Sequence, residues 1–155
     1  MDKYCLKQDW ERAIALEETA MSAAMEAESC NPKLALALYG RLANVFEHVS
    51  NRSMAAIQAH ERVMWIAHTL QETRVKAAAH ACCIKCCLTL SDLGSTASAL
   101  SKHMQVLEEL DDTRLQFDTG LQLAGIHEKL GNYEQTILLA RKALPIAQKL
   151  KDLSA

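Results

Sequence analysis

Residues 104–112, Met-Gln-Val-Leu-Glu-Glu-Leu-Asp-Asp, are the stretch that decides the fold, because similar stretches stand 40 residues before and after them. Residues 64–72 read Met-Trp-Ile-Ala-His-Thr-Leu-Gln-Glu, and residues 144–152 read Leu-Pro-Ile-Ala-Gln-Lys-Leu-Lys-Asp. Each copy has an apolar residue at its first, third, fourth and seventh place and an acidic residue at its ninth. Repetition at a fixed period of 20–50 residues indicates a stack of similar structural units.

The apolar spacing within each unit predicts helices. Apolar residues recur at intervals of three and four, and each unit divides into two helices at a short polar break. The break of the third unit, at 91–95, reads as two or three residues longer than the others. The predicted helices are 9–29, 32–49, 53–70, 73–91, 96–110, 113–130 and 133–151. We therefore expect a single array over 1–155, with a partial repeat at 9–30 and repeats at about 31–71, 72–111 and 112–152.

The composition agrees with an all-α protein and excludes several classes of function. Half of the residues are hydrophobic but only 5% are aromatic, and the chain has just 5 Gly and 2 Pro for turns. The net charge of −2 gives no basic footprint for nucleic acid. No apolar run approaches the ~20 residues that span a bilayer, and the N-terminus lacks the apolar core of a signal peptide. We expect a cytoplasmic protein, with the nucleus as the alternative, that binds neither nucleic acid nor membranes.

One repeat carries a recognisable family pattern, formed by Leu123, Ala124, His127, Leu130, Gly131, Asn132, Tyr133, Thr136, Ile137, Ala140, Ala143 and Leu144. It resembles the tetratricopeptide repeat (TPR), although His127, Thr136 and Ala140 replace residues that are usual in that family. The period of 40 is similar to the long repeats of Pins-type spindle-orientation adaptors, rapsyn and kinesin light chain. The resemblance implies an all-α fold: a right-handed superhelix of antiparallel helix pairs, or TPR-like α-solenoid, with about seven helices.

The resemblance also implies a binding surface, because in TPR proteins the first helices of successive pairs line a concave groove. Asn44 could pair with a peptide amide through both its donor and its acceptor. Basic side chains could meet carboxylates. The alternative is an ordinary solvated face, since exposed polar residues need no partner. The groove residues carried over in this way are Arg41, Asn44, Glu47, His48, Lys85, Gln122, Gly125 and Lys129.

The most unusual local feature is the cluster Cys82-Cys83-Ile84-Lys85-Cys86-Cys87. Thiolates and a nearby His could hold zinc, but four ligands are awkward to supply from one straight helix. Free Cys packs well as a small apolar residue, so we expect core packing, with metal binding and redox sensing as alternatives. The register of this helix could be set on Cys83 or on Cys86. Four methionines at helical spacing are likewise expected to fill the core, with a binding stripe as the alternative: Met21, Met25, Met64 and Met104.

The sequence thus predicts a non-catalytic adaptor, without cofactor or metal, that holds a protein or peptide segment in its groove. No Ser, Cys or His stands in a recognisable catalytic pattern. The alternative is a structural subunit, or a homodimer formed through the ends of the array. The segment from Trp10 to Ile14 resembles the start of a second helix whose first helix is missing. That would leave an apolar face of Ile14, Ala20, Met21 and Ala24 in need of a cover.

Overall fold

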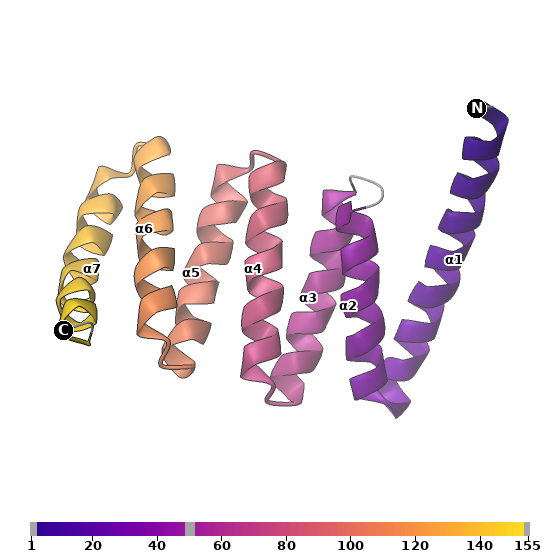
Figure 1. Ribbon diagram of the computed structural model, residues 1–155, viewed down its shortest axis with the longest axis horizontal. Helices are drawn as coiled ribbons and strands as arrows, with labels where there is room; N and C mark the ends of the chain where they lie inside the picture. Colours follow the sequence, from indigo (N-terminus) through magenta and orange to yellow (C-terminus); the bar gives the residue numbers. More distant parts are fainter. Residues whose placement is uncertain (1–2, 49–51, 154–155) are drawn as a thin grey trace.

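The computed structural model describes residues 3–48 and 52–153, and this part of the chain contains seven α-helices and no strand. The helices are α1 (Lys3–Cys30), α2 (Pro32–His48), α3 (Ser53–Thr69), α4 (Thr73–Thr89), α5 (Leu93–Glu109), α6 (Thr113–Lys129) and α7 (Tyr133–Leu153). They stand in a row in chain order, run alternately up and down, and leave the two ends of the chain at opposite ends of the row (Figure 1). The prediction of an all-α fold is confirmed.

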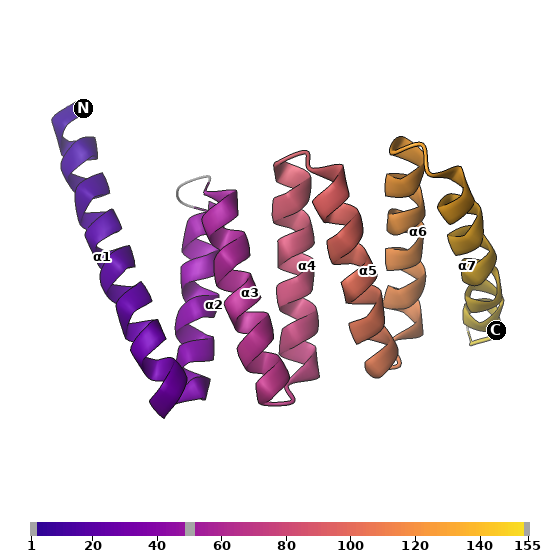
Figure 2. The same ribbon diagram turned by 180° about the vertical axis from the view of Figure 1, so that it is seen from behind.

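Each helix packs against the next one along the chain, as expected for a repeat array whose units touch mainly their neighbours. In Figure 1 α2 lies in front of α3, and in Figure 2, seen from behind, α3 lies in front of α2. Successive helices therefore belong to different layers at this point of the row. The two layers give the molecule two faces with different side chains.

The four turns that follow α3, α4, α5 and α6 stand 20 residues apart, which is half of the period seen in the sequence. A residue with positive φ stands at the centre of each of these four turns: Gln71 (57°), Ser91 (56°), Asp111 (52°) and Gly131 (76°). Around Asp111, the N–H of Asp112 donates to Leu107 O over 3.3 Å and the N–H of Asp111 donates to Glu108 O over 3.2 Å. This pair of bonds is the Schellman motif, which satisfies the last carbonyls of a helix.

The prediction of a longer break at 91–95 is wrong, because the turn there is as short as the others and α5 begins at Leu93. Asp92 caps the helix: its Oδ1 accepts a hydrogen bond from the backbone N–H of Ser95 over 3.0 Å. Such a cap fixes the first turn of a helix, where Gly94 is tolerated. The first helix also differs from its predicted start at residue 9, since α1 already begins at Lys3.

The recurring apolar residues form the core. Ile66 and Val106 are buried, as are Ala67 and Leu107, at equal places of two successive repeats. Burying a Leu or Ile side chain contributes roughly 1.5–3 kcal/mol each. In the last copy, the corresponding residues of α7 are only half-buried, because no further helix packs over them in the described chain.

Helix α1 is tied to the array by polar contacts in addition to its apolar face. Tyr39 donates a hydrogen bond to Glu28 Oε1 over 2.6 Å, and Arg62 lies 3.7 Å from the same oxygen. At the middle of α1, Glu17 forms an ion pair with Arg52.

The apolar face expected to be open on α1 is largely covered, which corrects that expectation. Ala24 is fully buried, and Ala20 and Met21 are half-buried against the same core cluster as Tyr39. This cluster contains residues of α2 and α3, so the chain itself supplies the cover. The side chain of Ile14 lies outside the described residues.

Candidate functional site

The register of the first helices follows from their equal lengths. Helices α2, α4 and α6 each have 17 residues, and their eleventh residues, Leu42, Cys83 and Leu123, are all buried. The cysteine helix is therefore registered on Cys83 rather than on Cys86.

The eight residues predicted for the groove all lie on these three helices. With the register fixed, Arg41, Cys82 and Gln122 are equivalent, as are Asn44, Lys85 and Gly125, and also His48, Thr89 and Lys129. We call the surface formed by these nine residues and Glu47 the first-helix face. Six of the eight predicted residues are exposed, and Glu47 and Gly125 are half-buried. Seven of the eight stand at three equivalent positions of these helices, and Glu47 directly precedes His48 on α2.

Two glycines leave open space on these helices. A Cβ added to Gly40 or to Gly125 would meet nothing within 4 Å. Neither residue is therefore needed for helix packing. The absence of a side chain leaves room at these two places for a bound backbone.

Glu47 is the most connected of the predicted residues. Its Oε1 lies 2.5 Å from Lys85 Nζ on α4, and its Oε2 lies 4.0 Å from His60 Nε2 on α3. Glu47, His60 and Cys82 bring one ligand atom each within 4.8 Å of one another. Of the eight predicted residues, Glu47 and Lys85 are the pair that the structure joins by an ion pair.

Burial decides the protonation of the groups around Glu47. Burial lowers the pKa of His60, and the Glu47 carboxylate offsets part of this effect. Burial, and then the charge of Glu47, raise the pKa of the Cys82 thiol. At neutral pH His60 is therefore a neutral imidazole and Cys82 a thiol.

Core packing, the expectation for the cysteine cluster, is confirmed for Cys83, Cys86 and Cys87, which are buried. Burial and the neighbouring thiols raise the pKa of Cys83 to about 12. Such thiols are unreactive at neutral pH, because the thiolate is the reactive form. Cys82 differs from the other three because it is only half-buried and faces Glu47.

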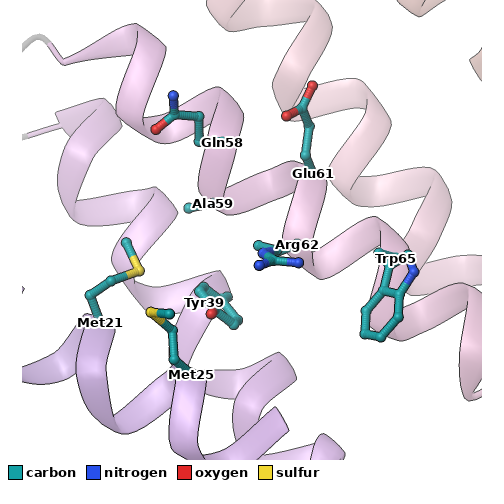
Figure 3. A pocket seen from close by; sticks show the side chains of 8 residues that line it. All are labelled: Met21, Met25, Tyr39, Gln58, Ala59, Glu61, Arg62 and Trp65. Carbon is teal, nitrogen blue, oxygen red and sulfur yellow. The ribbon is translucent and has the colours of Figure 1, made fainter.

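The other face of the array carries a cavity of about 510 Å³ that the sequence reading missed (Figure 3). Met21 and Met25 line it from α1, and Arg62 and Trp65 line it from α3. Trp65 is 57% exposed and Met25 is 58% exposed, so the expectation that Met25 fills the core is wrong. One signal for this cavity was present in the sequence. Trp65 stands at the repeat position that the polar Gln105 occupies in the next repeat, so a large apolar side chain is expected to be exposed there.

None of the described helices is long and apolar enough to cross a membrane. No family model matches the sequence, and no curated protein matches it significantly.

Solved structures do match. One of them is the signal transduction ATPase with numerous domains (STAND) protein with a tetratricopeptide repeat sensor from Pyrococcus horikoshii, with a TM-score of 0.63 and 18% identity. The match covers 91% of this chain and 22% of the archaeal chain, so this protein spans about a fifth of the length of that one. At this identity the likeness concerns the fold. The chain is a TPR-like helical repeat array.

Proposed function

We propose that this protein is a non-catalytic interaction module that binds an extended segment of a partner protein across the first-helix face. The observation that carries the proposal is the set of exposed polar side chains at equivalent positions of α2, α4 and α6, with open space above Gly40 and Gly125. Because the array is already folded before it binds, it loses little conformational entropy when the complex forms.

The chemistry of the face suits a peptide with carboxylates toward both ends of the contact. Arg41 and Lys129 are exposed cations on α2 and α6. Between them, Lys85 is already neutralised by Glu47. Asn44 offers an amide that can donate to and accept from a peptide backbone. The partner is therefore expected to meet charge at both ends of the face and hydrogen bonds from Asn44 at the α2 end.

The structural likeness supports an interaction role in a further way. The archaeal protein is described as carrying a tetratricopeptide repeat sensor, and repeat arrays in general offer extended binding surfaces. We place the protein in the cytoplasm or nucleus, with a protein partner and with neither nucleic acid nor membrane as ligand.

Affinity capture with two charge-matched variants tests the proposal. The first combines Arg41→Glu, Asn44→Ala and Lys129→Glu on the first-helix face. The control combines Lys102→Glu, Gln105→Ala and Lys142→Glu, which are exposed residues of α5 and α7. Both are checked for folding by circular dichroism. We expect the first variant to lose the partner at least tenfold, because reversed charges and a lost hydrogen bond act at the contact, and the control to keep it. Equal retention by both variants would rule out the face.

A second function, end-to-end association, is favoured by one observation on α7. Ile137 and Leu144 are 54% and 63% exposed. Their equivalents one repeat earlier, Ala97 and Met104, are buried and half-buried. The outer side of α7 therefore carries apolar residues that a neighbouring helix covers elsewhere in the array.

Light scattering on a size-exclusion column tests this second function. The double variant Ile137→Glu, Leu144→Glu is compared with the wild type over a range of concentrations. A wild-type dimer that the variant abolishes supports association through α7. A wild type that stays monomeric at high micromolar concentration removes it.

A further inference from the structure

Three side chains from three successive helices, α2, α3 and α4, lie close together. Glu47 comes from α2, His60 from α3 and Cys82 from α4, and their ligand atoms lie within 4.8 Å of one another. Carboxylate oxygen, imidazole nitrogen and thiolate sulfur are the ligand types that bind Zn²⁺ in proteins. Ligands from separate elements remove the difficulty of surrounding an ion from a single helix.

His60 gives an independent sign of a ligand. The residue is only 4% exposed, and its Nε2 has no hydrogen-bond partner within the described part of the chain. Buried polar atoms are nearly always paired, because leaving one unpaired costs free energy. This nitrogen lies 4.0 Å from Glu47 Oε2, too far for a hydrogen bond. A cation between the two atoms would satisfy both.

Lys85 holds the Glu47 carboxylate in the orientation that such an ion needs. Its Nζ contacts Oε1, which leaves Oε2 toward His60. Outer contacts of this kind fix the orientation of a metal ligand and raise metal affinity. Lys85 itself is exposed, so its ammonium stays hydrated.

We propose that Glu47, His60 and Cys82 form a binding site for a divalent transition-metal ion of the zinc class. Tetrahedral coordination at the usual bond lengths separates ligand atoms by about 3.3–3.6 Å. The observed separations need a contraction of roughly 1 Å, which side-chain rotation supplies. Water takes the fourth position, because three protein ligand atoms converge.

The balance of charge and protons favours this class of ion. Cys82 loses its thiol proton to solvent when its sulfur binds the ion, as metal binding to thiols requires. The thiolate and the Glu47 carboxylate then supply two negative charges toward the cation, and the one net positive charge left on the group lies on the exposed, hydrated Lys85 ammonium. A single hard oxygen ligand is too few for Ca²⁺ or Mg²⁺, whereas sulfur and imidazole favour Zn²⁺. The bound ion would clamp α2, α3 and α4, and so join two successive helix pairs.

Cobalt titration of the full chain under reducing conditions tests the site, since Co²⁺ reports thiolate ligation through a charge-transfer absorption band. We expect one Co²⁺ per chain, a thiolate band and displacement by Zn²⁺. Cys82→Ser, His60→Gln and Glu47→Gln should each weaken binding at least tenfold. Matched controls are Cys30→Ser, an exposed thiol of α1, and His103→Gln, a buried His of α5, and both should bind like the wild type.

Two results would overturn the proposal. One is a wild-type chain that shows no thiolate band with Co²⁺ in excess. The other is unchanged affinity in His60→Gln and Glu47→Gln together with loss in Cys82→Ser and Cys86→Ser, which would put the ion on α4 alone. If His60→Gln does not fold, Cys82→Ser and Glu47→Gln, at half-buried positions, carry the test.

Discussion

The ammonium of Lys85 on α4 lies 2.5 Å from the Glu47 carboxylate on α2, so an ion pair ties two successive helix pairs together on the first-helix face. Charge reversal tests this contact. Lys85→Glu alone places two carboxylates side by side and should lower the melting temperature. Exchanging the charges, in Glu47→Lys with Lys85→Glu, should recover most of the loss, because the attraction is restored. The single variant Glu47→Lys is measured as well. If the melting temperature of the double variant is no higher than the sum of the two single effects predicts, the contact is contradicted.

The turns predict opposite effects for glycine at different places. Asp111 has a φ of 52°, and at the equivalent place of the next turn stands Gly131. Because positive φ costs an L-residue about 1 kcal/mol, Asp111→Gly should stabilise by up to about 1 kcal/mol, and Gly131→Ala should destabilise by a similar amount.

Gly40 and Gly125 are the matched controls for these turn variants. They lie inside helices with open space above them, so Gly→Ala there should stabilise by roughly 0.5–1 kcal/mol. Urea unfolding measures all four variants. The same sign for Gly131→Ala and Gly125→Ala would show that the turn geometry is wrong.

The protein should lose stability in acid because the imidazole of His80 is buried. Burial, followed by the charges of His103, Lys76 and Lys102, lowers its pKa to about 4. Since the folded pKa lies below the ordinary 6.5, the stabilising contribution is complete above pH 6.5 and is lost as the pH falls toward 4. Between pH 7.5 and pH 5 this group should remove about 2 kcal/mol from the free energy of unfolding.

His80→Leu isolates that contribution. Urea unfolding at pH 7.5 and pH 5 should show a smaller pH dependence in the variant than in the wild type. Part of the dependence should remain, because burial also lowers the pKa of His60 and His103. His68→Gln, at an exposed position, should behave like the wild type. A His80→Leu protein with the full wild-type dependence would contradict the burial of this imidazole.

The sequence was sufficient to predict the helical array. Its two signals, apolar spacing of three and four within each helix and repetition every 40 residues, can both be read directly along the chain. It was insufficient for the turn at Asp92, where Gly94 and Ser95 were read as part of a break. The cap that keeps them helical consists of two local hydrogen bonds, from the backbone N–H and the hydroxyl of Ser95 to the carboxylate of Asp92. The shorter 20-residue period was missed because its defining residue differs in every turn and shares only its backbone angle.

The groove residues could be placed on their helices from the family pattern, but the grouping of Glu47, His60 and Cys82 could not. These residues are 13 and 22 positions apart in the chain, and their distance depends on how successive helix pairs pack. The cavity beside Trp65 was missed for the same reason, since its walls come from α1 and α3. Sequence patterns identify faces of helices, whereas sites between helices need the packing.

Site-specific photo-crosslinking tests the central claim, binding across the first-helix face, most directly. A photoreactive amino acid is placed at Asn44 or Gln122 on that face, and at Gln58 or Gln105 on α3 and α5; all four positions are exposed. We expect crosslinks to one partner segment from Asn44 and Gln122, and none from Gln58 and Gln105. Crosslinks that form from Gln58 and Gln105 but not from Asn44 and Gln122 would contradict it and move the interface to the opposite face.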